Sequence, residues 1–299
     1  MPVAWCCLVA AICGSVAAQE PANTPKDGKP KDRFLRLVRD KDEVPLAVET
    51  AIVHCAPAQG KQGPTVDLVA AVHVAERTYY DQLNQQFGAY DAVLYELVAP
   101  QGTRIPKGGG KGSGSFVSLV QKAMKDILQL EYQLEVIDYT RKNMVHADMS
   151  PEQMAKAMRD RGESVWTILL RMMGYALARQ SQPGRSSDTD LLLALFDKNR
   201  ALALKRVLAE QIEDIEGSLM AIEGPEGSTI ISGRNKAALA VLRQQIAAGK
   251  RKIAIFYGAG HMPDLQQRLR DEFGLVPVST RWLVAWDMKP KPKTTPAKP

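Results

Sequence analysis

His261 stands where a strand is expected to give way to a helix. Residues 253–257 form an unbroken apolar run, which indicates a strand buried on both faces. The Gly-Ala-Gly sequence at 258–260 permits a sharp turn into His261, and Pro263 then opens an amphipathic helical pattern. Open α/β sheets bind their ligands at the carboxyl ends of the strands. His261 is therefore a candidate binding residue.

The same order of features occurs earlier in the chain, around His73. Residues 66–88 read VDLVAAVHVAERTYYDQLNQQFG and residues 252–274 read KIAIFYGAGHMPDLQQRLRDEFG, so each copy has an apolar run, a histidine and a helical pattern ending in Phe-Gly. We interpret them as an approximate internal repeat. The expected fold is α/β, with a central mixed β-sheet made of two related strand-His-helix-strand halves. In one sheet, His73 and His261 would project from equivalent strand ends.

A carboxylate follows the first copy of the repeat. Residues 92–97, AVLYEL, form another buried strand pattern with Glu96 near its carboxyl end, where an acid is unusual for a core strand. Glu96 adds a carboxylate to the two histidines. Histidine and carboxylate side chains are metal ligands, so these three residues could build a metal site from a duplicated half.

Two further polar positions have alternative interpretations. Asp148 precedes a helix that Ser150 caps, and it could be a ligand, an acid or a part of the connection; the structural role is favoured. Arg234 opens a helical pattern over residues 234–247. It could bind a carboxylate or phosphate bidentately, or it could be an exposed arginine at a helix end.

The middle of the chain differs in pattern from the repeat units. Residues 116–219 are mostly helical in pattern, and we interpret them as a helical insertion that serves as a lid or substrate groove. The glycine-rich stretch 102–115 lacks the Gly-Lys-Ser/Thr sequence of a phosphate loop and is interpreted as a mobile loop.

Further strands are expected at both ends of the domain. An edge hairpin should precede the first repeat unit, and a strand pair should close the domain with Trp282 and Trp286 on one side of a strand. The segments concerned are 34–38 and 46–54 for the hairpin, and 276–278 and 280–287 for the final pair.

Composition limits the classes of function. The chain has 299 residues, of which 45% are apolar and 24% charged, so it can bury a full core. The formal charge of +6 owes much to the lysines of residues 289–299, which we expect to form a disordered Lys/Pro tail. The body is close to neutral, and no nucleic-acid partner is expected.

The first residues are typical of an exported protein. Residues 1–18 have an apolar middle and end in small residues, which indicates a signal peptide; an uncleaved membrane anchor is the alternative, and the only route to membrane association. Residues 19–33 are expected to be a disordered linker before the folded domain, 34–288. The mature chain would keep one cysteine, Cys55, and would be periplasmic, cell-surface or extracellular.

Taken together, these residues resemble the TraB/PrgY/GumN family, which includes the Tiki metalloproteases and is distantly related to the erythromycin esterases. The resemblance is carried by Val-His at 72–73, YDAVLYEL at 90–97, Arg-Asn at 234–235 and GAGHM at 258–262, and it spans about residues 66–287. His261 matches the family's second Gly-x-x-His motif completely. At the first motif Ala70 stands where the family usually has glycine.

The resemblance implies a metal centre and a hydrolytic reaction. His73, His261 and Glu96 would bind a divalent metal, Mn²⁺ or Co²⁺ in preference to Zn²⁺, with Glu96 as a ligand or a base. Arg234 would stabilise a developing oxyanion, and a peptide or small molecule with an ester bond would be the substrate. A non-catalytic protein that sequesters a peptide or other ligand is the alternative, and a metal or haem carrier is a third hypothesis.

Overall fold

The computed structural model describes residues 34–59, 61–108, 127–164, 188–212 and 227–290, together with positions 166, 167, 170, 173 and 223. All of these belong to one compact unit, Arg33–Pro299. The expected signal peptide, the linker, most of the tail and much of the glycine-rich loop lie outside the described residues. No described helix is long and apolar enough to cross a membrane.

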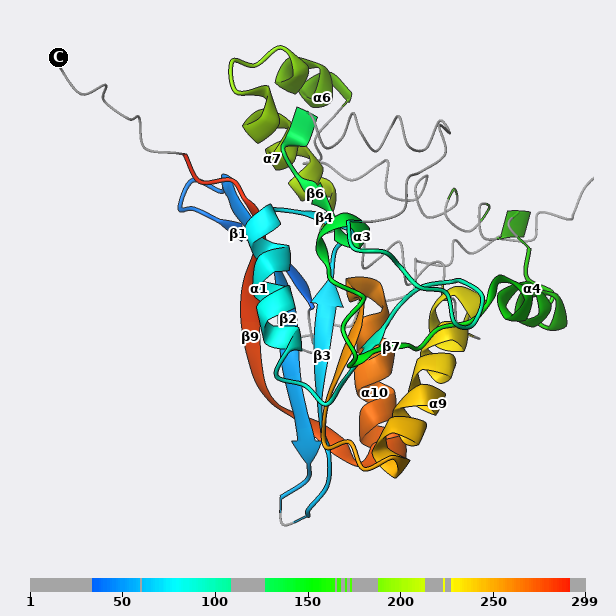
Figure 1. Ribbon diagram of the computed structural model, residues 1–299. Coiled ribbons are helices and arrows are strands. Elements are labelled where there is room, and N and C mark those ends of the chain that lie inside the picture. The colour runs from blue at the N-terminus through cyan, green and yellow to red at the C-terminus, as the bar shows by residue number, and fades with distance from the viewer. Residues whose placement is uncertain are drawn as a thin grey trace, which may run out of the picture. The chain divides into compact units, whose positions relative to one another are not determined.

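A mixed seven-stranded sheet forms the centre of the fold, in the order β1-β2-β3-β8-β5-β7 with β9 paired to β2 (Figure 1). Strands β3, β8, β5 and β7 are mutually parallel, whereas β2 runs antiparallel to β1, β3 and β9. The expected mixed α/β class is therefore confirmed. The strands are β1 (Leu35–Arg39), β2 (Pro45–Pro57), β3 (Thr65–Ala71), β5 (Ala92–Tyr95), β7 (Met144–His146), β8 (Lys252–Gly258) and β9 (Leu275–Asp287). A separate pair joins β4 (Val74–Ala75) to β6 (Glu131–Tyr132).

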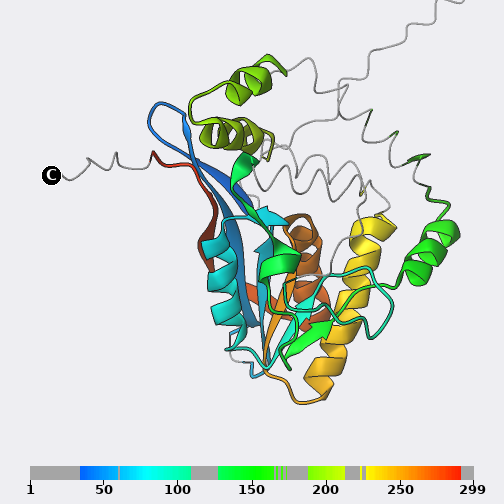
Figure 2. The same cartoon turned by 45° about the horizontal axis from the view of Figure 1, so that its top comes forward.

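Helices cover both faces of the sheet because the parallel strands are apolar on both sides. Val69 and Phe256 face a core that includes α1 (Arg77–Phe87). Leu68 and Ile255, their neighbours in the chain, face the opposite core, formed with α9 (Arg234–Ala247) and α10 (Met262–Phe273). Figure 2 shows α1 and α9 on opposite sides of the strands.

The connections change direction between β3 and β8. The chain leaves β3 through α1 and crosses β8 to reach β5, whereas it leaves β8 through α10 and returns past β3 to β9. Since β9 and β3 are both antiparallel to β2, β9 runs in the same direction as β3. In open α/β sheets such a change of direction opens a crevice at the carboxyl ends of the two strands. The carboxyl ends of β3 and β8 lead to His73 and His261.

The second repeat copy has the expected local structure. The run 253–257 lies in β8, the helix begins with Pro263 in its first turn, and Gly274 ends it with φ +65°. Gly258 and Gly260 are different, because neither has a positive φ. The turn into His261 is a short 3₁₀ segment, η2 (Ala259–His261), which any residue type could adopt.

Two strand predictions were wrong in detail. The first hairpin is not an edge hairpin, because its second strand, β2, lies inside the sheet and pairs with β1, β3 and β9. The last two segments form one continuous strand, β9, whose pairing with β2 shifts register twice. The shift at Val48/Glu49 moves Trp286 to the α1 face while Trp282 stays on the α10 face. An extra residue in a bulge breaks the alternation that the prediction assumed.

The segment expected to be a helical insertion also contributes to the sheet. It contains β6, the short helix α3 (Gln133–Val136) and β7, which the sequence analysis did not predict. Among the described residues of this segment, three longer helices follow: α4 (Pro151–Asp160), α6 (Asp188–Leu195) and α7 (Arg200–Ile212). Ser150 caps α4 through a capping box, as its sequence indicates.

Candidate functional site

Four parallel strands deliver four polar side chains to one edge of the sheet. His73 follows β3, Glu96 follows β5, Asp148 follows β7 and His261 follows β8. The fifth member, Arg234, is the first residue of α9. Parallel strands end at the same edge, and the topology therefore gathers residues that are far apart in the sequence.

Arg234 joins both carboxylates of this site. Its Nε and Nη2 donate to Asp148 Oδ1 and Oδ2 at 3.0 and 2.5 Å, and Nη2 also donates to Glu96 Oε1 at 2.7 Å. The third nitrogen, Nη1, lies 3.5 Å from His261 Nε2. The Asp148 side chain has no exposed area and that of Arg234 is 10% exposed. The bidentate, buried pairing excludes the simple helix-end role for Arg234, and it makes Asp148 a member of the site.

A π-helical turn, η1 (Thr229–Gly233), leads directly into Arg234. Ser228 accepts a hydrogen bond from Ile231 N and so caps this turn. Single π turns occur frequently at functional sites, because the extra residue changes the direction in which the following side chains project.

Asn235 fixes the tautomer of His261. The Asn235 Nδ2 donates to His261 O at 3.1 Å and to Asp264 Oδ2 at 2.8 Å, so both amide hydrogens are used. The Asn235 Oδ1 must then accept from His261 Nδ1, 2.8 Å away. Nδ1 carries the proton, and Nε2 presents its lone pair toward Glu96 and Arg234. The sequence analysis did not predict that Asn235 orients His261. The only indication in the sequence was that Asn235 directly follows Arg234.

Gly258 brings the backbone close to Glu96. Its N–H donates to Glu96 Oε2 at 2.7 Å. A Cβ at this position would lie 3.4 Å from the same oxygen and 3.9 Å from His261 Cδ2. These are ordinary van der Waals distances, so neither a steric clash nor an unusual φ requires glycine at 258. Ala70 stands where the first motif of the resembling family usually has glycine. It lies within β3 in extended structure and has no positive φ, so its backbone conformation does not require glycine.

The pKa values of Glu96 and His261 are both lowered, for different reasons. Burial raises the pKa of Glu96, but His261, Arg234, the Gly258 N–H and His73 together lower it below its ordinary value. Burial lowers the pKa of His261, with Arg234 acting in the same direction, and the attraction of Glu96 only partly offsets this. At neutral pH the site thus holds an ionised Glu96 beside a neutral His261.

His73 is the predicted residue least integrated into the site. Its side chain is exposed, and its backbone oxygen accepts from Gln133 N at 3.0 Å. It is close enough for its charge to lower the pKa of Glu96. Nevertheless, within the described residues no three His, Cys, Asp or Glu side chains are grouped closely enough to hold a metal ion.

The donor atoms present are suited to a divalent cation. His261 Nε2 and Glu96 Oε1 lie 3.6 Å apart, and both can contact one ion at ~2.0–2.2 Å. Two carboxylates against one guanidinium leave one net negative charge. A metal-binding histidine usually donates its second ring N–H to an oxygen, as His261 does to Asn235. His261 and Glu96 thus offer two donor atoms of the kind that a divalent cation uses, and the expected third ligand, His73, is not grouped with them.

Cys55 and His54 lie apart from this edge. Cys55 is buried, whereas His54 contacts Asp67 Oδ1 through Nδ1 at 2.5 Å. The two side chains occupy opposite faces of β2, as their adjacent positions predict.

Comparison of the chain with protein-family models, with curated proteins and with solved structures finds no match. The resemblance to the TraB/PrgY/GumN family therefore rests on the motifs quoted above.

Proposed function

We propose that the protein is an exported metal-dependent hydrolase of the TraB/GumN/Tiki type, acting on a peptide or ester bond. In this proposal the fold consists of two related strand-His-helix-strand halves: β3 and α1 with β5, and β8 and α10 with β9. Residues 1–18 would direct export. The partners would be a peptide or small-molecule substrate and a divalent metal, Mn²⁺ or Co²⁺ before Zn²⁺.

One observation supports the proposal most strongly. His261 is buried and neutral, its Nδ1–H is bound to Asn235, and its Nε2 lone pair lies 3.6 Å from an ionised Glu96. The pair lies at the carboxyl ends of β8 and β5, beside the point where the sheet connections reverse. A nitrogen and a carboxylate oxygen fixed in this way are suited to holding a cation.

Each residue has a specific task in this proposal. A bound metal supplies a nucleophilic water at neutral pH. Glu96 acts as a ligand rather than a base, since its lowered pKa makes it a weak proton acceptor and both of its oxygens already accept hydrogen bonds. Arg234 Nη1 makes no closer contact than that to His261 among the described residues, so it can donate to an oxyanion. Asp148 holds the guanidinium in place.

Elemental analysis of protein purified without chelator tests the proposal. We expect near-stoichiometric metal in the parent and none in His261→Ala or His73→Ala. His54→Ala is the matched control, because His54 lies outside the site and its loss should leave metal content unchanged. A folded parent that stays metal-free after reloading with manganese, cobalt and zinc would eliminate the metal-dependent reaction.

A non-catalytic, ligand-sequestering protein is the second candidate. All four carboxylate oxygens of Glu96 and Asp148 accept hydrogen bonds, and the site is therefore stable without a reaction to perform. A library of peptides and esters, supplied with the metal found, separates the two candidates. Metal-dependent cleavage supports the hydrolase, whereas capture without cleavage supports the sequestering protein.

A further inference from the structure

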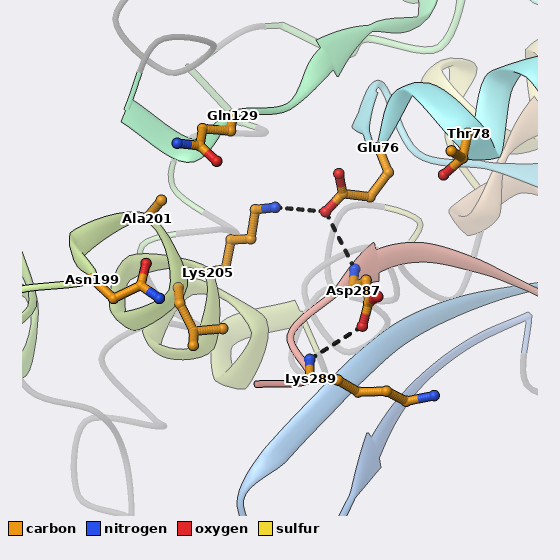
Figure 3. A pocket seen from close by; sticks show the side chains of 9 residues that line it. Glu76, Thr78, Gln129, Asn199, Ala201, Lys205, Asp287 and Lys289 are labelled. Atoms are coloured by element: carbon orange, nitrogen blue, oxygen red, sulfur yellow. Dashed lines mark hydrogen bonds and ion pairs between the residues drawn. The ribbon is translucent and has the colours of Figure 1, made fainter. Parts of the chain in front are cut away.

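A polar hollow of about 230 Å³ lies apart from the candidate site and shares none of its residues (Figure 3). Its walls come from the start of α1, the turn before β6, the start of α7 and the end of β9. It lies at the same edge of the sheet, since α1 begins shortly after His73 and β9 ends here in the direction of β3. The polar side chains that carry the argument are Glu76, Thr78, Gln129, Asn199, Lys205 and Asp287.

A partly buried ion pair forms one wall of the hollow. Lys205 is only 7% exposed, and its Nζ contacts Glu76 Oε1 at 2.6 Å. Asp287 N also donates to this oxygen, at 3.4 Å. Buried ion pairs add little stability compared with apolar side chains of similar size. Here the pair fixes the Glu76 carboxylate, whose Oε2 accepts no hydrogen bond from any residue that the structure describes.

Four charged residues line the hollow, the acids Glu76 and Asp287 and the bases Lys205 and Lys289. The Lys205 ammonium neutralises one of the two carboxylates, and the Asp287 Oδ1 accepts only the backbone N of Lys289, at 3.1 Å. Figure 3 shows the Lys289 side chain pointing away from Glu76 and Lys205. One carboxylate therefore lacks a cationic side-chain partner within the described part of the chain, and a positively charged group would be attracted to it.

Uncharged polar groups complete the hollow. The side chains of Thr78, Gln129 and Asn199 make no hydrogen bond to other described residues, so they are available to a ligand. Gln129 has φ 55°, in the left-handed region that residues other than glycine rarely adopt. Backbone conformations of this kind concentrate at ligand sites, where the surrounding structure holds them.

We propose that this hollow binds a primary ammonium group on a small polar ligand. Asp287 and Glu76 accept hydrogen bonds from the ammonium, and the Gln129 and Asn199 amides contact hydroxyl or amide groups beside it. The volume is below the ~300–1,000 Å³ of sites for drug-sized ligands, which limits the bound part to about one residue or one sugar ring. The amino terminus of a peptide and an amino sugar share this chemistry. Binding here requires neither metal nor turnover.

Calorimetric titration of the full chain with alanyl-alaninamide and with glucosamine tests the proposal. The N-acetylated form of each probe is the matched control, because it keeps the shape and loses the charge. We expect at least one ammonium probe to bind, its acetylated form to bind about tenfold more weakly or not at all, and Asp287→Asn to weaken binding about fivefold. Asn199→Ala, an exposed position, provides a second variant that leaves the ion pair intact.

Controls separate this site from the proposed metal centre. His261→Ala should bind the ammonium probe with unchanged affinity, even where it loses metal and activity, and so should Asp271→Asn on the exposed side of α10. Binding by one probe alone identifies the source of the ammonium group as peptide or amino sugar. The proposal is overturned if neither probe binds, if the acetylated forms bind equally well, or if the Asp287 and Asn199 variants both retain full affinity while folded.

Discussion

Replacing Arg234 with methionine should destabilise the folded protein severely at neutral pH. The guanidinium is the shared partner of two carboxylates, contacting Asp148 at 2.5 Å and Glu96 at 2.7 Å. Methionine has a similar length and no charge, so the variant keeps most of the packing. It leaves two like charges facing one another in a site from which water is largely excluded.

The structure sets the expected magnitude. The side chains of Asp148 and Glu96 are 0% and 13% exposed, and solvent can therefore do little to replace the lost cation. Removing one partner of a buried ion pair typically costs ~3–5 kcal/mol, because the remaining charge is left uncompensated. We expect a loss in this range at pH 7. Arg243→Met is the matched control on the same helix, where the arginine is 53% exposed and pairs with Glu272; its loss should be below ~1 kcal/mol.

The deficit should depend on pH in a defined direction. Removing the Arg234 charge takes away one of the interactions that hold the pKa of Glu96 below its ordinary value, so this pKa is higher in the variant than in the parent. A raised acid pKa in the folded state penalises the folded protein at pH above that pKa, and the penalty shrinks as pH falls through it. Urea unfolding of parent and variant at pH 7.5 and pH 5 measures both effects. A loss below ~1 kcal/mol at pH 7.5, or a loss equal at the two pH values, would refute the assignment of Arg234 as the shared counterion.

Three further outcomes are expected. Asn235→Ala should mix the tautomers of His261 and weaken metal binding by ~10–100-fold, which ¹⁵N NMR of the imidazole and a metal titration would detect; a single retained tautomer would contradict the role of Asn235. Because burial lowers the pKa of His261, its neutral state should be lost only below pH ~6.5, the ordinary pKa of histidine, and hydrolytic activity should persist down to that lower pH. A decrease of kcat/KM that begins at or above pH ~6.5 would show that His261 is not the group whose titration limits activity. Tyr79→Phe should cost ~1–3 kcal/mol in urea unfolding, because the buried hydroxyl donates to Ala70 O at 3.0 Å; an unchanged midpoint would show that this bond contributes nothing.

Local patterns in the sequence were sufficient for the second repeat unit. The apolar run before His261, the proline in the first helical turn and Gly274 each act through neighbouring residues, and the structure has the expected strand, helix and left-handed C-terminus. The placement of Glu96 at the end of a buried strand was predictable for the same reason. Hydrophobic periodicity and helix-end residues depend on neighbouring positions in the chain, so they predict these elements without knowledge of the tertiary contacts.

The contacts that build the site are long-range, and no local pattern encodes them. Asp148 meets Arg234 across 86 positions of the chain, and Glu96 meets it across 138. Strand β7 has only three residues, so its apolar signal is too short to distinguish from the helices around it. The bulge of β9 opposite Val48 and Glu49 reverses the side to which Trp286 points, since one inserted residue shifts a period of two.

The Asp148–Arg234 pair also closes the base of the insertion. The chain departs from the sheet just after Asp148, continues through α4, α6 and α7, and returns through η1 immediately before Arg234. Glu163, beyond the end of α4, accepts the Thr229 N–H in η1 at 3.0 Å, and Arg161 donates to Gly227 O at 2.6 Å. Because η1 immediately precedes Arg234, these contacts join the end of α4 to the turn that positions the guanidinium between Glu96 and His261. The Asp148–Arg234 pair therefore joins the two ends of this segment beside Glu96 and His261.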